Sequence, residues 1–358
     1  MNILFISRAT LFTNKGGDTI QITRTASELK KLGVHTDIRL SNETIDYSAY
    51  DLIHFFNIIR PADIMNHVRL SRKPYVVSPI FVDYGEYDKT IRKGLSGKLF
   101  KLFSPDFIEY GKVIARSLVN GEKIMSQQYI WSGHSKSVKQ VIRHAKMLLP
   151  NSENEYRRLT NRYNESKEFH VIPNGIDTGI FGKRTSGIIR NNKSILCVGR
   201  FEGLKNQLSL IKALNNTEFN LILVGKPSTN QAKYFEQCRK NAANNVSFIY
   251  DLTQEQLVDY YQQAYVHVLP SWFETTGLSS LEAAASGCNV VITDKGDTRE
   301  YFSDLAFYCD PASPQSIFDA VKKASESPID EALRNRILSN YTWPITAQRT
   351  LQAYQKII

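Results

Sequence analysis

The chain has 358 residues, of which 42% are hydrophobic and 22% are charged, and its formal net charge is +10. This length exceeds one ordinary core and predicts two domains. The composition is that of a soluble globular protein, which argues against a disordered chain. No apolar run approaches the roughly 18–20 residues that span a bilayer, so we expect no transmembrane helix.

The first half of the chain alternates between strand and helix patterns. We expect a strand in the opening apolar run, and not a signal peptide, because Arg8 interrupts that run. Asp18 follows a glycine loop and could cap a helix that extends to about Leu32 on apolar residues at helical spacing. A second helical segment precedes residue 75, and a charged helix begins near Glu153. The predicted strands are residues 2–7, 34–40, 51–58, 75–81, 147–151 and 170–172.

A second alternating series follows the turn at Asn174-Gly175, which we interpret as the linker between domains. Such alternation favours parallel sheets with helices on both faces, so we expect two successive doubly wound α/β units. The predicted strands of this half are residues 194–198, 220–224, 246–249, 266–269 and 290–293, and its clearest helices are residues 206–214 and 231–241.

The four cysteines are widely spaced and form no Cys-x-x-Cys pair. Most of them lie in or beside strand-like or small-residue segments, which is typical of small core side chains and not of disulfides or metal ligands. A reducing cytoplasm is the simplest setting for them. They are Cys197, Cys238, Cys288 and Cys309.

Two glutamates flank a predicted helix start. Glu274 follows the strand at 266–269, and Glu282 lies about two turns into a helix that we expect from Thr276 to Gly287. The N–H groups of Thr276, Gly277 and Leu278 would be free at that start, and together with the helix dipole they favour an anion. The pattern indicates a phosphorylated, hydroxyl-rich ligand. The alternative is an ordinary N-capped surface helix.

Two cations follow the strand at 194–198. Gly199 lets the backbone turn at the carboxyl end of this strand, the edge where open parallel sheets bind ligands. Arg200 offers a bidentate fork for phosphate oxygens, and Lys205 offers a point charge. With the amides at 276–278 they could hold a diphosphate. The alternative is a pair of solvated surface charges.

Several signatures are missing from the chain. It contains no Gly-x-Gly-x-x-Gly fingerprint for a nicotinamide dinucleotide and no Gly-x-x-x-x-Gly-Lys-Ser/Thr loop. It also contains no Asp-x-Asp triplet and no histidine pair at ligand spacing, so we expect no metal site and no cofactor.

The spacing of Glu274 and Glu282, with the small residues that follow, resembles the signature of the retaining glycosyltransferases of family 4. Four further segments are similar to that family's N-terminal glycine loop, interdomain segment, diphosphate-binding element and C-terminal end. They occur in the family's order over nearly the whole chain: Gly16-Gly17, residues 172–177, Gly199-Arg200 with Lys205, and residues 341–343.

The resemblance implies an α/β protein of the GT-B fold, in which two Rossmann-like, doubly wound domains face each other across a cleft. It implies an acceptor-binding domain at 1–174, a nucleotide-sugar-binding domain at 175–343, and a C-terminal helix at 344–358 that crosses back to the first domain. Carried over, Glu274 contacts the donor sugar as the catalytic residue, and Glu282 binds the ribose hydroxyls. The remaining implied donor contacts are Gly16, Gly17, Arg200, Lys205, Thr276, Gly277 and Leu278.

The implied function is a retaining, metal-independent hexosyltransferase. It would move a sugar from a nucleotide diphosphate sugar, with UDP as the first expectation and GDP as the second, to a glycan or lipid-linked acceptor. Surface polysaccharide or lipopolysaccharide synthesis is the expected setting. The alternatives are a GT-B sugar-nucleotide epimerase, a phosphorylase for which no cofactor-binding lysine context is visible, and a non-catalytic adaptor that uses a basic surface.

The chain departs from the family pattern at two places. Many members keep a His near the acceptor after the fourth N-terminal strand, where this chain has residues 77–83. Asp83 is the nearest polar candidate for an acceptor contact there, and its alternative role is to shape a loop. Thr275 replaces the first glycine of a Gly-Phe-Gly segment. The less flexible Thr275 could alter the choice of sugar.

A basic segment extends from Lys89 to Lys146, with 12 Lys or Arg against 3 acidic residues and hence a net charge of +9. Its stretch 91–103 mixes cations with Leu and Phe. We expect either peripheral contact with an anionic membrane or a helix pair packed inside the protein. We expect no nucleic-acid partner, because no recognised nucleic-acid motif is present. The expected location is cytoplasmic, with peripheral attachment to the inner face of the membrane as a further hypothesis.

Overall fold

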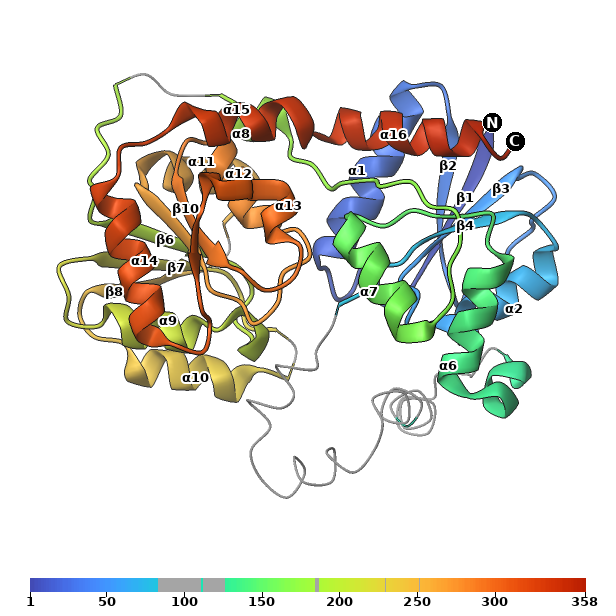
Figure 1. Ribbon diagram of the computed structural model, residues 1–358, viewed down its shortest axis with the longest axis horizontal. Helices are drawn as coiled ribbons and strands as arrows, with labels where there is room; N and C mark the ends of the chain where they lie inside the picture. The colour runs from blue at the N-terminus through green and yellow to red at the C-terminus, as the bar shows by residue number, and fades with distance from the viewer. Residues whose placement is uncertain (83–110, 112–125, 184–186, 229, 251) are drawn as a thin grey trace. The chain divides into compact units, whose positions relative to one another are not determined.

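The computed structural model describes residues 1–82, 111, 126–183, 187–228, 230–250 and 252–358. The described chain divides into two compact units. Unit 1 comprises Met1–Pro173 together with Trp343–Ile358, and unit 2 comprises Asn174–Thr342. Each unit contains one sheet in which every strand pair is parallel, with helices packed on it (Figure 1).

The sheet of unit 1 has the strand order β2-β1-β3-β4-β5. The strands are short and almost wholly apolar in the middle of the sheet, as parallel strands covered on both faces are. Their bounds are β1 Asn2–Ser7, β2 His35–Leu40, β3 Leu52–Phe56, β4 Tyr75–Ser78 and β5 Met147–Leu148. The helices of this unit are α1 Gly17–Lys31, α2 Pro61–Ser71, α6 Gln127–His144, α7 Glu153–Tyr163 and α16 Trp343–Gln355.

Alternate residues of these strands supply two cores in unit 1. Ile3 and Phe5 point to the face that α1 and α16 cover, where Tyr354 is fully buried. Leu4 and Ile6 point to the other face, which α2, α6 and α7 cover. The last helix, α16, therefore completes a core that begins with the first strand.

The sheet of unit 2 has the strand order β11-β10-β9-β6-β7-β8. Its strands are β6 Ser194–Val198, β7 Asn220–Val224, β8 Val246–Ile249, β9 Val266–Leu269, β10 Asn289–Thr293 and β11 Phe307–Cys309. Its helices are α8 Thr178–Phe181, η1 Gly203–Lys205, α9 Gln207–Leu214, α10 Ala232–Asn241, α11 Gln254–Gln263, α12 Leu278–Ala285, α13 Thr298–Phe302, η2 Ser303–Leu305, α14 Pro314–Glu326 and α15 Glu331–Asn340.

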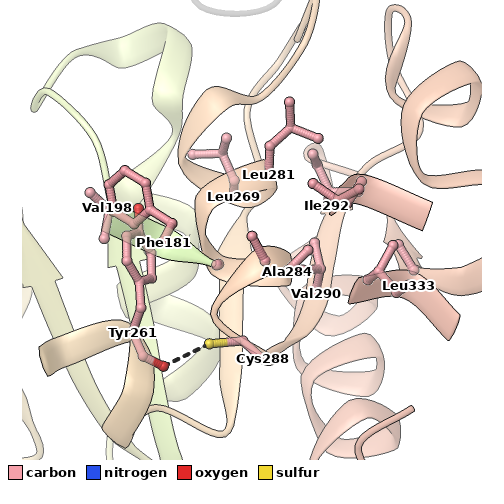
Figure 2. Close-up of a cluster of buried hydrophobic side chains, with 14 of the residues drawn as sticks. Phe181, Val198, Tyr261, Leu269, Leu281, Ala284, Cys288, Val290, Ile292 and Leu333 are labelled. Carbon is pink, nitrogen blue, oxygen red and sulfur yellow. Dashed lines mark hydrogen bonds between the residues drawn. The ribbon is translucent and has the colours of Figure 1, made fainter. Parts of the chain in front are cut away.

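Two cores also flank the sheet of unit 2. On one face α9, α10 and α14 pack against alternate residues of the central strands. On the other face α8, α11, α12, α13 and α15 enclose the cluster drawn in Figure 2. There Leu281 and Ala284 of α12 meet Val290 and Ile292 of β10. This packing fixes α12 on the sheet.

Two local predictions are wrong. Asp18 does not cap α1, because its carboxylate binds the guanidinium of Arg8, with Nε 2.6 Å from Oδ2, while Gly16 holds the N-cap position. Residues 170–172 do not form a strand, although two of their N–H groups donate to residues 148 and 150. Pro150 has no N–H to donate, so a ladder on β5 cannot extend.

Much of the basic segment lies outside the described residues, including the stretch 91–103; of the segment 89–146, residues 111 and 126–146 are described. Within the described part of the chain, no helix combines the length and the apolar character needed to cross a membrane.

Candidate functional site

The strand order of unit 2 creates a topological switch point between β6 and β9. The chain moves outward through β7 and β8 on one side of β6, and then adds β9, β10 and β11 on the other side. Loops that leave the carboxyl ends of β6 and β9 therefore diverge, and open parallel sheets bind ligands between such loops. Lys205 lies in η1 after β6, and Glu274 lies in the loop after β9.

Lys205 and Glu274 form an ion pair at this switch point. Nζ of Lys205 lies 2.6 Å from Oε1 of Glu274, and the hydroxyl of Ser271 donates to the same oxygen at 2.5 Å. The side chain of Glu274 is only 7% exposed, and that of Lys205 is 22% exposed. Ser271 is fully buried. Ser271 is not part of any motif found in the sequence, although its position three residues before Glu274 in a loop is a signal that could have indicated the contact.

The backbone of Glu274 is fixed by the loop after β10. Its N–H donates to the carbonyl of Lys295 at 3.1 Å, and its carbonyl accepts from the N–H of Asp297 at 2.9 Å. Gly296 lies between them with φ at 101°, and a Cβ there would lie 2.0 Å from the carbonyl oxygen of Glu274. Glycine alone permits both this left-handed backbone and this approach.

The helix α12 begins two residues later than the sequence predicts. Gly277 takes a left-handed conformation, with φ at 70°, and holds the N-cap position. In the part of the chain that the structure describes, the N–H groups of Thr276, Gly277 and Leu278 donate to no protein acceptor. Free amides at the positive end of a helix dipole favour an anion.

A buried network supports the start of α12. Asn174 donates through Nδ2 to the hydroxyl of Thr276 at 3.0 Å, and through its N–H to the hydroxyl of Tyr301 at 3.2 Å. Thr276 donates to the same Tyr301 oxygen at 3.4 Å. All three residues are buried. The position of Thr276 is therefore set by residues from two distant parts of unit 2.

Glu282 lies in the second turn of α12, and a buried phenol orients it. The hydroxyl of Tyr261 donates to Oε2 of Glu282 at 3.0 Å. Tyr261 belongs to the core of Figure 2, where the thiol of Cys288 donates to its carbonyl oxygen. Burial, and then the charge of Glu282, raise the pKa of Tyr261 well above its ordinary value, so the phenol remains a donor. Tyr261 was not predicted as a site residue, because no local sequence pattern pairs α11 with α12.

Arg200 is the more exposed of the two predicted cations. Its side chain is 42% exposed, and one guanidinium nitrogen lies 3.4 Å from Oε1 of Glu202. The carbonyl oxygen of Gly199 would lie 2.0 Å from a Cβ on Gly225, so β6 and β7 approach closely at their carboxyl ends. An exposed guanidinium beside this edge can turn toward an anion in the site.

The remaining predicted residues belong to unit 1. Gly16 is the N-cap of α1, where its N–H donates to a hydroxyl in the first turn at 3.1 Å, and Gly17 is the first residue of the helix. Arg8 holds the preceding loop by donating to Asp18 and to two loop carbonyls. Asp83 lies outside the described residues.

All four cysteines are free and buried, which confirms that they are core side chains. Burial raises the pKa of Cys197 to about 12, despite the opposing effect of the positive charge on Lys205. Cys197 is therefore a neutral thiol and not an activated nucleophile. Across the described residues, His, Cys, Asp and Glu form no group of three or more that could hold a metal ion.

Residues 182–341 match the sequence model of the family described as Glycosyl transferases group 1, which confirms the resemblance to glycosyltransferases for this part of the chain. The chain is 30% identical over 178 residues to a D-inositol 3-phosphate glycosyltransferase from Acidothermus cellulolyticus, a match that covers 44% of this chain and 40% of that protein. It is 28% identical over 199 residues to a glycogen synthase from Mycobacterium tuberculosis, covering 52% of this chain and 48% of that protein. The chain thus spans about half the length of the curated relatives it matches.

Solved structures resemble the whole chain. Sucrose-phosphate synthase from Thermosynechococcus elongatus has a TM-score of 0.73 at 16% identity, with 100% of this chain and 99% of that chain covered. HepE from Anabaena, in complex with UDP-glucose, has a TM-score of 0.69 at 16% identity, with both chains covered completely at 100%. The lipopolysaccharide outer core galactosyltransferase WaaB has a TM-score of 0.65 at 13% identity, again with 100% of both chains covered. At these identities the likeness shows the fold alone, and it confirms the predicted GT-B class with two Rossmann-like units.

Proposed function

We propose that this chain transfers a sugar from a nucleotide diphosphate sugar to a glycan or lipid-linked acceptor. Its residues 182–341 match the sequence model of the group 1 glycosyltransferases. The observation that carries the proposal is the pair of Lys205 and Glu274 at the switch point of unit 2, with the free amides of the α12 start following in the same loop. The HepE structure contains UDP-glucose, which makes UDP-glucose the first donor to test and a GDP-sugar the second.

In this proposal the donor lies along the carboxyl edge of β6 and β9. Lys205, Arg200 and the amides at 276–278 hold the diphosphate, because cations and oriented N–H groups both favour its charge. Glu282 accepts hydrogen bonds from the ribose hydroxyls, and Glu274 contacts the donor sugar. Both carboxylates are acceptors that suit hydroxyl donors.

The proposed reaction breaks the bond between the sugar and the diphosphate oxygen, and forms a bond from the acceptor oxygen to the same sugar carbon. Negative charge develops on the leaving diphosphate, where fixed cations and amides stabilise the transition state. The leaving phosphate oxygen takes the proton of the acceptor hydroxyl. Attack on the face from which the diphosphate departs retains the configuration of the sugar, and no metal ion enters this scheme.

Unit 1 supplies the remaining contacts of the proposal. Gly16 and Gly17 are proposed donor contacts, because the absence of side chains permits a close backbone approach. Asp83 is the proposed acceptor contact. Similarity to WaaB in fold makes lipopolysaccharide or surface polysaccharide synthesis the setting to test first.

A thermal-shift experiment without added metal tests this function. UDP, GDP and ADP, each with a matching nucleotide sugar, are compared on the full chain. A ligand that binds only the native state raises the melting temperature by mass action. We expect one nucleotide to raise the melting temperature, and we expect Arg200→Ala to abolish this shift. The control variant Lys322→Ala, which removes an exposed ion pair with Glu326, should retain the shift. No shift with any nucleotide on folded protein would contradict the proposal.

We also propose that unit 1 makes peripheral contact with an anionic membrane. Two observations favour it: the charge of +9 over 89–146, and the side chain of Trp131 on α6, which is 90% exposed. An exposed indole in a segment of this charge suits the headgroup region. Sedimentation with phosphatidylglycerol vesicles, against phosphatidylcholine vesicles as control, tests the contact. We expect Trp131→Ala to reduce binding to the anionic vesicles, and equal sedimentation with both lipids would contradict it.

A further inference from the structure

Glu274 uses its two carboxylate oxygens unequally. Oε1 accepts both from Nζ of Lys205 at 2.6 Å and from the hydroxyl of Ser271 at 2.5 Å. Oε2 accepts no hydrogen bond from any residue that the structure describes. It is also not among the buried side-chain atoms that lack a partner, so it meets solvent.

The two donors to Oε1 come from loops that are hydrogen-bonded to each other. The carbonyl of Leu204, next to Lys205, accepts from the N–H of Trp272 at 2.9 Å, which joins η1 to the loop that carries Ser271. Asn206 donates to the carbonyl of Pro270 at 3.1 Å and is itself only 3% exposed. These bonds tie the loops after β6 and β9 together, so the backbone that carries both donors is held in place without a ligand.

Lys205 and Ser271 differ in how many further hydrogen bonds they can donate. An ammonium group has three N–H donors, so Lys205 can bind Oε1 and still offer two donors to a diphosphate. A hydroxyl has one donor, so Ser271 is committed to Glu274 alone. Loss of the Ser271 hydroxyl would therefore free the carboxylate to turn, without removing a group that meets the diphosphate.

We propose that Ser271, together with Lys205, is a positioning residue that holds Oε1 of Glu274 and presents Oε2 to a hydroxyl of the donor's sugar ring. This inference rests on the proposed function. It assigns recognition of the sugar to one oxygen atom of Glu274, and it makes the bond from Ser271 a determinant of affinity for the nucleotide sugar but not for the nucleotide diphosphate.

Titration calorimetry with UDP and with UDP-glucose tests the inference on the full chain. Since a hydrogen bond to a charged group is involved, we expect Ser271→Ala to weaken UDP-glucose about tenfold and to change UDP affinity by less than about twofold. Ser325→Ala is the matched control, because it removes another buried hydroxyl, 5% exposed and bonded to a carbonyl in α14. It should change neither affinity.

A second pair of variants isolates the hydroxyl from the change in volume. Thr and Val have nearly the same shape, so Ser271→Thr and Ser271→Val differ mainly in the donor. We expect the Thr variant to bind UDP-glucose more tightly than the Val variant by a similar factor, with equal affinities for UDP. This pair also serves if the Ala variant does not fold.

The outcomes separate the inference from the proposed function. If Ser271→Ala weakens the binding of UDP and of UDP-glucose equally, Ser271 only supports the loop. If it changes neither affinity, Glu274 does not need the hydroxyl of Ser271. Either result would overturn the inference and leave the proposed donor site standing. If GDP or ADP is the nucleotide bound, the comparison is made with that nucleotide and its glucose conjugate. Wild-type protein that binds none of the three nucleotides would overturn the proposed function and this inference with it.

Discussion

At Gly296 the absence of a side chain decides whether Glu274 can be held in place. A Cβ there would lie 2.0 Å from the carbonyl oxygen of Glu274, whereas a Cβ at Gly187, also at positive φ, would meet no atom within 4 Å among the residues that the structure describes. Left-handed strain alone costs about 1–2 kcal/mol. We expect Gly187→Ala to lower the free energy of unfolding by that amount, and Gly296→Ala to lower it by about 3 kcal/mol or more.

Urea unfolding of the two variants, with UDP-glucose binding to each, measures the difference. Gly296→Ala should also lose UDP-glucose affinity, because the loop that carries Glu274 must shift to admit the methyl group. Equal destabilisation by the two substitutions would show that the close approach to Glu274 carries no cost of its own.

Tyr261 provides a second prediction at this scale. Tyr261→Phe removes the donor that orients Glu282, so UDP should bind about three- to tenfold more weakly. The loss should vanish for 2′,3′-dideoxy-UDP, which lacks the hydroxyls that Glu282 is proposed to bind. Tyr265→Phe removes a comparable phenol bond, to the carbonyl of Ser327, and should leave both affinities unchanged. Calorimetry with the two nucleotides on each variant tests this, and equal weakening of both nucleotides by Tyr261→Phe would contradict it.

The candidate site could be predicted from the sequence only in part. Charged residues beside glycines at strand ends, such as Arg200 and Lys205, are visible as patterns because the chemistry and the turn lie within a few residues. The partners that orient the site residues are not visible in this way. Tyr261 reaches Glu282 from another helix, and Asn174 reaches Thr276 from 102 residues away. Such contacts arise from packing, which no local spacing encodes.

Among the elements, α12 has two ends that are treated differently. Its start is a glycine with free amides, and its last carbonyls are bound by two arginines. Arg334 donates to the carbonyls of Ala285 and Gly182, at 2.9 and 2.7 Å, and Arg190 donates to that of Ser286 at 2.6 Å. Cations at this end complement the helix dipole. The amide end of the helix is thus left open while the other end is anchored.

We expect Arg334→Ala to lower the free energy of unfolding by about 2–3 kcal/mol, because it leaves two carbonyls without their charged donor. Lys322→Ala, which removes an exposed i,i+4 pair with Glu326, should cost less than about 1 kcal/mol. Urea unfolding measures both. A similar small loss in the two variants would mean that the α12 carbonyls find other partners.

Element types were easier to predict than element ends. Apolar runs and helical periodicity identified the central strands and the first helix, since burial on one or both faces imposes these patterns. The ends failed where backbone conformation overrode the pattern. Gly277 takes a left-handed conformation and delays α12, and Pro150 ends β5 early. The short β11 was not predicted at all, because three residues carry too little periodicity.

At the scale of the whole molecule, the described strands of each unit contain one buried histidine. Burial lowers the pKa of His54 in β3 and of His267 in β9 from 6.5 to about 3. The unfolded chain therefore takes up protons below pH 6.5 that the folded protein does not. The free energy of unfolding should fall as pH falls from 6.5 toward 3, by up to about 1.4 kcal/mol per pH unit for each histidine.

His54→Gln tests this dependence. His54 bonds to the hydroxyls of Tyr354 at 2.6 Å and Ser78 at 2.9 Å, so the variant should be less stable at pH 7. Between pH 6.5 and 5 its stability should fall less steeply than that of the wild type, by the contribution of one proton. Urea unfolding at pH 7, 6 and 5 measures the slopes, and parallel slopes would contradict the assignment.

The composition of unit 1 from two separated segments has a consequence for synthesis. Ala347, Ala353 and Tyr354 of α16 belong to the core that Phe5 and Ile22 begin. A ribosome delivers these residues only after all of Asn174–Thr342. Domains generally fold as units as they emerge. All residues of unit 2 are therefore available for folding before unit 1 is complete, and until α16 emerges the face of the unit 1 sheet that it shares with α1 is covered only in part.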